Sequence, residues 1–236
     1  FYQSKRLDIY KKYVEQLIKE DKAYYCFCTK ERLDEMRTAQ QAEKRIPKYD
    51  RHCLNLSKEE ISKKLENKES YVIRLRLPDN QDIIFKDGVY GEVKINTNDM
   101  DDQVLLKSDG YPTYHLAVVV DDFAQGITNV VRGADLLDST PRQIYLQKLL
   151  GYSTPTYKHL PVAVNNNGEK LSKQTKAAHL DISSPVKQLM KAVNFLGQEP
   201  PIELQKENIM SFWKWAFVNW NPKKIHKKRI IQFPNR

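Results

Sequence analysis

The sequence predicts an α/β fold in which the strands of a parallel sheet alternate with crossover helices. The continuous apolar run Ala117–Val120 is typical of a strand that is buried on both faces. Ile127–Val131 predicts a further strand, and Pro141–Leu150 predicts a helix, because proline suits the first turn of a helix. Leu160–Val164 is another short apolar run. Strand and helix patterns in succession indicate parallel strands that are joined by crossovers.

The other elements follow from local patterns. Apolar residues recur at helical spacing over residues 4–20, which predicts an amphipathic helix. The segments Tyr71–Leu77 and Ile83–Phe85 are rich in β-branched and aromatic residues, so they predict short strands. Two terminal helices are expected over Pro185–Leu196 and Lys206–Trp220.

Composition limits the classes of protein that the chain can belong to. Its 236 residues carry 39 lysines and arginines against 30 acidic residues, a net charge of +9 that fits a polyanionic partner. The basic residues concentrate at Lys223, Lys224, Lys227, Lys228 and Arg229. No run of about 18 apolar residues is present, which argues against a membrane-spanning helix. Three cysteines, an odd number, argue against a disulfide framework and predict a cytoplasmic protein.

The three cysteines form a candidate metal site. Cys26 and Cys28 are separated by one residue, and Cys53 lies 25 residues further on. Zinc takes four ligands in a tetrahedron, and a close pair with a more distant group is a common way to supply them. The fourth ligand would be Tyr49 or His52, and coordination chemistry alone favours the histidine because a phenolate is an unusual ligand. The alternative is three free, partly buried thiols.

A lysine-rich loop is the second candidate. The segment Lys170–Gln174 follows the turn Asn165–Gly168 and places two lysines three residues apart, with a serine between them. Ammonium groups on such a loop can bind the negative charge that develops on a leaving pyrophosphate. The alternative is a solvated basic turn without a specific ligand.

The third candidate surrounds the predicted strands. In open parallel sheets, ligands bind at the carboxyl ends of the strands. Arg132 follows the second of these strands and is suited to a bidentate contact with a carboxylate, and Tyr114 can donate a hydroxyl beside it. The alternative is that Arg132 pairs with an acidic neighbour and that Tyr114 packs in the core.

Several segments together resemble one family. In chain order they are Tyr114–Asp122, Gly126–Thr128, Val131–Leu137, Thr140–Gln143, His159–Pro161 and Lys170–Lys173. This ordered set resembles the catalytic domain of the glutamyl-type class I aminoacyl-tRNA synthetases over residues 3–220. Within that family, Lys170–Gln174 and Asn194–Gln198 are more similar to the glutamyl-queuosine tRNA(Asp) synthetases, which are short paralogues without an anticodon-binding domain.

The resemblance implies a partial Rossmann-type class I synthetase catalytic domain with a zinc-binding insertion and a helical C-terminal part. Residues 1–20 would be a helix of the nucleotide-binding fold, and residues 21–97 the zinc-bearing insertion with short strands. Residues 98–180 would form the second half of the catalytic domain with the lysine-rich loop, and residues 181–236 the helical C-terminal region.

The resemblance also implies a reaction and its partners. The family activates L-glutamate with ATP, with Mg²⁺ expected beside the nucleotide, and the paralogue does so without tRNA. It then transfers glutamate to queuosine at the wobble position of tRNA(Asp). By this resemblance Tyr114 and Arg132 contact glutamate, and Lys170 and Lys173 are the catalytic residues. The ATP-binding loop consists of Lys170, Leu171, Ser172, Lys173 and Gln174.

The zinc ligands implied by the resemblance differ from those that chemistry alone favours. Cys26, Cys28, Tyr49 and Cys53 match the zinc site of the family, and His52 becomes the second choice for the fourth ligand. We expect one structural zinc ion, because the set of ligands would be closed and lies far in sequence from the ATP loop.

One motif of the family is missing from these residues. A class I synthetase needs a HIGH-type strand-to-helix motif that holds ATP, and residues 1–236 contain none, so we expect the chain to be N-terminally incomplete and inactive alone. Glutamate-dependent ATP–pyrophosphate exchange by the 236-residue chain is expected to equal that of a blank without enzyme. Exchange above the blank would contradict this expectation.

Two alternatives remain at this point. The chain could be a truncated glutamyl-tRNA synthetase that charges tRNA(Glu), and the 24 residues between Cys28 and Cys53 favour that enzyme. It could also be a non-catalytic, zinc-bearing RNA-binding module, which fits the positive charge and the missing motif.

Overall fold

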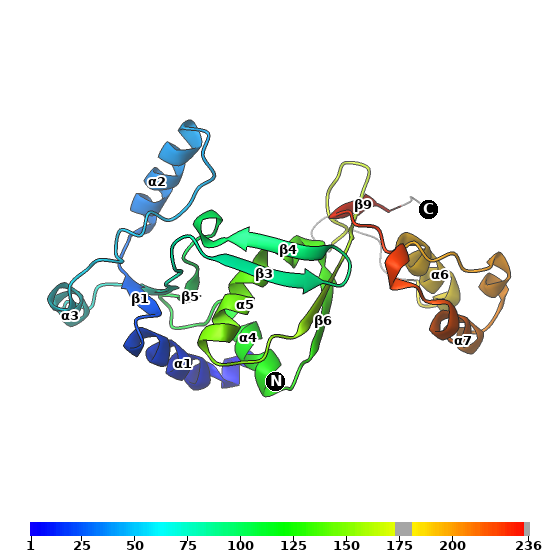
Figure 1. The fold of residues 1–236 in the computed structure, drawn as a ribbon, viewed down its shortest axis with the longest axis horizontal. Coiled ribbons are helices and arrows are strands. Elements are labelled where there is room, and N and C mark those ends of the chain that lie inside the picture. Colours follow the sequence, from blue (N-terminus) through cyan, green and yellow to red (C-terminus); the bar gives the residue numbers. More distant parts are fainter. Residues whose placement is uncertain (173–180, 234–236) are drawn as a thin grey trace. The chain divides into compact units, whose positions relative to one another are not determined.

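The computed structural model describes residues 1–172 and 181–233 and divides the chain into two compact units. The first unit comprises Phe1–Phe85, Lys94–Thr128 and Ser139–Pro155, and the second comprises Lys86–Val93, Asn129–Asp138 and Thr156–Arg236. Figure 1 follows the chain through the successive elements. The division of the sequence into four segments stays a prediction.

The first unit contains most of the helices. Its helices are α1 (Leu7–Lys19), α2 (Lys30–Ala42), α3 (Lys58–Glu66), α4 (Tyr114–Ala124) and α5 (Thr140–Leu149), with 3-10 turns at Gln3–Lys5 and Thr97–Asp99. Its strands are β1 (Ala23–Cys26), β2 (Val72–Leu75) and β5 (Val104–Leu106). These strands form an antiparallel sheet in the order β1-β2-β5, and Cys26 pairs with Val72 at the end of β1.

The second unit contains parallel strands and two C-terminal helices. Its elements are β6 (Asn129–Gly133), β7 (Thr156–Leu160), β8 (Val162–Val164), α6 (Pro185–Phe195), α7 (Ile209–Asn219) and β9 (Ile230–Gln232), with 3-10 turns at Ile202–Lys206 and Pro222–Lys224. The strands β3 (Asp82–Asp87) and β4 (Gly91–Asn96) and the 3-10 helix η3 (Ala134–Ser139) cross the boundary between the units. Buried side chains from α6 and α7, among them Met190 and Phe212, form a separate small core.

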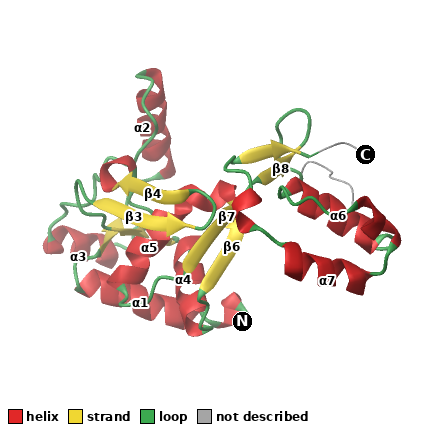
Figure 2. Cartoon of the chain, turned by 45° about the vertical axis from the view of Figure 1, so that its right-hand side comes forward, coloured by secondary structure: helices red, strands yellow, loops and turns green. Residues whose placement is uncertain are grey.

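The predicted parallel pairing is confirmed. Figure 2 shows β6 and β7 side by side, and they pair in parallel from Asn129 with Thr156 to Gly133 with Leu160. Asp87, at the end of β3, pairs in parallel with Tyr157 of β7, and the complete sheet has the order β4-β3-β7-β6. Parallel pairing brings the carboxyl ends of these strands to one edge of the sheet.

The prediction of a buried strand at Ala117–Val120 is wrong. These residues lie inside α4, where Leu116, Ala117, Val119 and Val120 are buried. That spacing is the helical one, whereas a continuous apolar run alone cannot distinguish a buried strand from a buried helix. The helix ends before Gly126, whose φ of +67° is the left-handed conformation common after a helix C-terminus. Tyr114 is therefore the first residue of a helix and does not precede a strand.

Buried polar contacts hold α4 against α1. The Tyr10 hydroxyl donates to the Asp121 carboxylate at 2.7 and 2.9 Å, and Arg6 Nε donates to the same group at 2.8 Å. Burial and the neighbouring carboxylate raise the pKa of Tyr10 to about 12, so its hydroxyl keeps its proton at neutral pH. Among the described residues, no helix has the length and apolar character needed to span a lipid bilayer.

Candidate functional site

The three cysteines come together in the first unit, as the sequence predicts. Cys26 ends β1, Cys28 follows two residues later, and Cys53 comes from the loop between α2 and α3. Their three sulfur atoms lie within 4.8 Å of one another, and Cys28 Sγ is 3.5 Å from Cys53 Sγ. Cys26 and Cys53 are buried, while Cys28 is partly exposed.

Tyr49, and not His52, lies beside the sulfur atoms. The Tyr49 hydroxyl is 3.2 Å from Cys26 Sγ and 3.4 Å from Cys28 Sγ, and it accepts a hydrogen bond from the Cys53 amide at 3.1 Å. The Tyr49 side chain is buried, whereas His52 is exposed and does not belong to the cluster of possible ligands. Arg51, between these two residues, has the left-handed backbone conformation, with a φ of +57°.

The distances suit a tetrahedral zinc ion. Zinc–sulfur bonds of about 2.3 Å place two tetrahedral thiolates about 3.8 Å apart, and a phenolate oxygen about 3.5 Å from each sulfur. The observed separations of 3.5 Å between sulfurs and of 3.2 and 3.4 Å from oxygen to sulfur are within a few tenths of an ångström of these values. Three thiolates and one phenolate thus fit a closed site.

The electrostatics of the cluster favour a thiolate at Cys26. Hydrogen bonds from Cys53, then from Tyr49 and Arg74, lower the pKa of the Cys26 thiol. The same interaction with Cys26, together with burial, raises the pKa of Cys53. Burial and hydrogen bonds to the cysteines raise the pKa of Tyr49, so binding of a cation to its oxygen must displace the phenolic proton.

Two arginines bring positive charge to the cluster. The Arg74 guanidinium is buried and lies 3.9 Å from the centre of the Tyr49 ring. Arg32, on α2, donates to Cys28 Sγ at 3.5 Å and forms an ion pair with Asp50 at 2.6 Å. Cations near thiolates stabilise the deprotonated form that binds metals.

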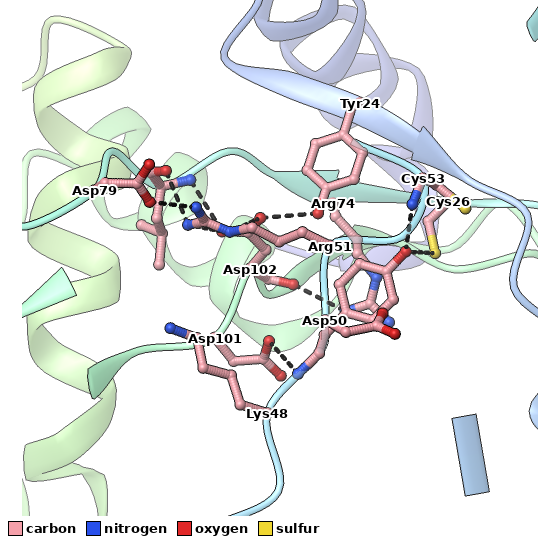
Figure 3. A network of polar contacts seen from close by, with 12 residues as sticks. Tyr24, Cys26, Lys48, Asp50, Arg51, Cys53, Arg74, Asp79, Asp101 and Asp102 are labelled. Carbon is pink, nitrogen blue, oxygen red and sulfur yellow. Dashed lines mark hydrogen bonds and ion pairs between the residues drawn. The ribbon is translucent and has the colours of Figure 1, made fainter. Parts of the chain in front are cut away.

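A buried carboxylate supports the segment that carries Tyr49 and Cys53. Asp102 accepts hydrogen bonds from the Tyr24 hydroxyl at 2.8 Å and from the Leu77 amide at 3.1 Å. Arg51 Nη2 donates to Asp102 at 3.0 Å, and Arg51 also pairs with Asp79 at the surface. Figure 3 shows Arg51 between these two carboxylates, close to Tyr24.

Removal of this buried carboxylate is expected to destabilise the first unit. The Asp102 side chain is fully buried, so Asp102→Ala leaves Arg51 and Tyr24 without their buried acceptor. We expect the free energy of unfolding to fall by about 3–5 kcal/mol, measured by urea denaturation. Asp79→Ala removes the exposed carboxylate of the same arginine and is the matched control, with an expected loss below about 1 kcal/mol. Equal losses in the two variants would contradict the prediction.

Arg132 lies inside β6 of the second unit, one residue before its carboxyl end, and not after the strand as the sequence predicted. Its Nε donates to His159 Nε2 at 3.1 Å, and its Nη2 donates to the Leu136 carbonyl at 3.4 Å. The guanidinium carbon is 5.3 Å from the centre of the Tyr157 ring. These contacts restrict the orientation of the guanidinium plane, which a bidentate contact with a carboxylate requires.

Lys170 lies close to the residues that follow Arg132. Its ammonium forms an ion pair with Asp135 at 2.6 Å, and Lys170 makes an antiparallel bridge with Val164. A Cβ atom on Gly133 would lie 2.4 Å from Asp135 Oδ1, so glycine permits the close approach of this carboxylate. Leu171 is partly exposed.

The other predicted contacts with ATP and glutamate are Ser172, Lys173, Gln174 and Tyr114. Ser172 is the last described residue before the gap, and Lys173 and Gln174 lie outside the described residues. Tyr114 begins α4 in the first unit, is 48% exposed, and makes an edge contact with the His115 ring at 5.5 Å between centroids.

Sequence reasoning assigned no role to Asp87 and His159. His159 Nδ1 lies 2.7 Å from Asp87 Oδ2, and both side chains are fully buried. The two residues are 72 positions apart, and only the parallel pairing of β3 with β7 brings them together. In the sequence, His159 is a single histidine shortly before Val162, and residue spacing alone does not indicate that Asp87 is its partner.

Comparison with known proteins places the chain in a class. Residues 1–196 match the family model of the class I tRNA synthetases for glutamate and glutamine (E and Q), catalytic domain. The chain belongs to this family of aminoacyl-tRNA ligases, whose members use ATP and Mg²⁺.

The similar proteins are glutamate–tRNA ligases. The chain is 55% identical over 174 residues to the enzyme of Clostridioides difficile, which covers 74% of this chain and 35% of that protein. It is 52% identical over 166 residues to the enzyme of Finegoldia magna, covering 70% of this chain and 34% of that one. The crystal structure of the glutamate–tRNA synthetase from Elizabethkingia anophelis superposes with a TM-score of 0.79 at 31% identity, over 98% of this chain and 52% of that one. The chain thus spans about a third of the length of these relatives and about half of the solved chain.

Proposed function

We propose that the chain is part of a glutamate–tRNA ligase, which activates L-glutamate with ATP and transfers it to tRNA(Glu). The observation that carries this proposal is Arg132, oriented at the carboxyl end of a parallel strand by His159 and Leu136. The family match over residues 1–196 and the 55% identity to a glutamate–tRNA ligase support the same reading.

The chemistry assigns separate tasks to the two carboxylates of glutamate. The α-carboxylate attacks the α-phosphorus of ATP, the bond from that phosphorus to the bridging oxygen breaks, and pyrophosphate leaves. The side-chain carboxylate binds a cation, and Arg132 supplies a planar pair of N–H donors for it. Tyr114 is the second proposed contact with glutamate. Selective binding of this carboxylate would favour glutamate over glutamine, which has a neutral amide.

Lysines of the ATP loop are the proposed contacts with the phosphates. Lys170 and Lys173 would stabilise negative charge on the leaving pyrophosphate, with Leu171, Ser172 and Gln174 completing the loop. In the structure the Lys170 ammonium contacts Asp135, so binding to a phosphate requires it to exchange this partner. Mg²⁺ would accompany ATP and share in the neutralisation of its charge.

A structural zinc ion is proposed at Cys26, Cys28, Tyr49 and Cys53. The buried position of the Tyr49 hydroxyl between two sulfurs supports it as the fourth ligand, and the exposure of His52 argues against the alternative. With four protein ligands, such a site is closed to substrate. Its role would be to hold β1 and the loop after α2 together.

The second candidate is transfer of glutamate to queuosine in tRNA(Asp). It is favoured by the similarity of Lys170–Gln174 and Asn194–Gln198 to the queuosine-specific paralogues. The similar proteins described above are glutamate–tRNA ligases, so we place the charging of tRNA(Glu) first. A non-catalytic RNA-binding role is the third outcome that an experiment has to separate.

One experiment distinguishes the three functions. The full-length protein would be incubated with ATP, Mg²⁺ and radiolabelled glutamate, and with either tRNA(Glu) or queuosine-containing tRNA(Asp). We expect label on tRNA(Glu), in a linkage that requires the 3′ terminal adenosine and does not form when that adenosine has been removed beforehand. Label on queuosine-containing tRNA(Asp) from which the 3′ terminal adenosine has been removed would support the queuosine reaction. Binding of either tRNA without ATP–pyrophosphate exchange would support the RNA-binding module.

A further inference from the structure

We propose that His159 is a positioning residue for Arg132, and that Asp87 fixes His159 in the tautomer that this task requires. The three side chains form a chain of hydrogen bonds, Asp87–His159–Arg132, within the second unit. The inference rests on the proposed function in one respect, which is that Arg132 binds a carboxylate of glutamate.

The direction of each hydrogen bond follows from the donors and acceptors available. Arginine has five N–H donors and no acceptor, so Arg132 Nε must donate to His159 Nε2 across the 3.1 Å contact. His159 Nε2 therefore carries a lone pair and no proton. A neutral imidazole then bears its proton on Nδ1, where the Asp87 carboxylate accepts it at 2.7 Å.

Asp87 is itself held by the backbone. Its Oδ1 accepts hydrogen bonds from the amides of Val89 at 2.9 Å and Tyr90 at 3.0 Å, and the His159 amide lies 3.4 Å away. Its other oxygen, Oδ2, faces the imidazole. The carboxylate thus has one oxygen committed to the turn after β3 and one committed to His159.

Burial supports a neutral imidazole. The side chains of Asp87 and His159 have no exposed surface, and burial is the largest influence on His159, lowering its pKa below the ordinary value. Asp87 opposes this shift, while the positive charge of Arg132 adds to it. A protonated His159 would also direct an N–H group at the Nε–H group of Arg132, which is repulsive.

The chain of contacts constrains the plane of the guanidinium group. His159 accepts from Nε, the Leu136 carbonyl accepts from Nη2, and the guanidinium carbon lies over the Tyr157 ring, 5.3 Å from its centre. The Tyr157 and His159 rings are nearly parallel, with 12° between their planes. Bidentate recognition depends on this plane, so a loss of the His159 contact weakens the binding of the carboxylate without removing the charge.

Asp87→Asn tests the tautomer directly. The amides of Val89 and Tyr90 require an oxygen at the position of Oδ1, so the new amide nitrogen replaces Oδ2 and donates to His159 Nδ1. The imidazole proton must then move to Nε2, where it opposes Arg132. In the full-length protein, ¹⁵N NMR of labelled histidine is expected to show protonated Nδ1 in the wild type and protonated Nε2 in the variant.

The same variant is expected to change the kinetics selectively. We expect the KM for glutamate in ATP–pyrophosphate exchange to rise about 10- to 100-fold, because misplacement of a binding group by about 1 Å has effects of this size. The KM for ATP is expected to change by less than about threefold, because Arg132 is the proposed contact with glutamate and not with ATP. Equal changes in both constants would indicate a merely structural role and overturn the proposal.

Two substitutions of His159 form a matched pair. His159→Gln can place an amide oxygen near the position of Nε2 and keep an acceptor for Arg132, whereas His159→Asn keeps a donor for Asp87 but loses that acceptor. We expect the glutamine variant to recover glutamate affinity relative to the asparagine variant by about fivefold or more. Indistinguishable affinities in two folded variants would overturn the proposal, as would a wild-type His159 that is protonated on Nε2.

Failure of the proposed function can be told apart from failure of this inference. A wild-type protein without glutamate-dependent exchange would contradict the proposed function, while the NMR measurement would still report whether Asp87 sets the tautomer of His159. If His159 is protonated on Nδ1 in both the wild type and Asp87→Asn, the inference is contradicted. Glutamate-dependent ATP–pyrophosphate exchange by the same wild-type protein would still support the proposed function.

Discussion

Replacement of Arg132 by leucine is expected to lower kcat/KM for glutamate about 1000-fold in ATP–pyrophosphate exchange by the full-length protein, which corresponds to about 4 kcal/mol. The reason is that the variant leaves a glutamate carboxylate without its bidentate cationic partner in the site. The fixed contacts of Arg132 with His159 and Leu136 mean that no reorganisation is needed before the carboxylate binds.

The controls for Arg132 separate charge from geometry. Arg132→Lys keeps the positive charge and loses the planar pair of donors, so a loss of about 10- to 100-fold is expected. Arg37→Leu removes an exposed arginine of α2 and is expected to leave the exchange rate within about twofold of the wild type. A similar decrease in the kcat/KM for ATP and for glutamate in Arg132→Lys would argue that Arg132 does not select the amino acid.

Replacement of Cys53 by alanine is expected to abolish stoichiometric zinc binding and to unfold the loop between α2 and α3 locally. The small cluster around this site has Tyr24, Cys26, Tyr49 and Cys53 as its buried members, so most of its buried groups are proposed ligands. When binding of a metal organises such a segment, the binding free energy is also folding free energy. We expect about one zinc per wild-type chain and none in the variant, with limited proteolysis at residues 43–57 as a second readout.

Two neighbouring substitutions identify the fourth ligand. Tyr49→Phe removes only the hydroxyl and is expected to weaken zinc affinity about 100-fold or more in competition with a chelator, because the tetrahedral site loses a ligand. His52→Ala removes an exposed side chain next to Cys53 and is expected to leave zinc affinity within about twofold of the wild type. A larger loss of zinc affinity in His52→Ala than in Tyr49→Phe would show that His52 is the fourth ligand, as coordination chemistry alone favoured.

The sequence predicted candidate site residues well where reactive or charged side chains lie close together in the chain. The cysteine spacing predicted a cluster, which is present. The strand pattern predicted Arg132 after a strand of a parallel sheet, and it lies in such a strand, next to its last residue. The apolar run Ala117–Val120 was assigned wrongly because it is uniformly apolar, and only the neighbours packed against it reveal the helical period. For the fourth zinc ligand, coordination chemistry alone favoured His52 and the family resemblance implied Tyr49; the structure places the Tyr49 hydroxyl beside the sulfurs.

The sequence by itself determined the class of the protein and the chemical groups that it has available: three thiols, an arginine and a pair of lysines in a family-specific order. The tertiary structure decided which other side chains lie beside these groups and contact them. Near Arg51, which has a left-handed φ of +57°, Tyr49 is buried and His52 is exposed. The parallel pairing of β3 with β7 brings Asp87 to His159 across 72 residues. Such contacts depend on strand register and loop conformation, which arise from the packing of distant segments and have no local signature in the sequence.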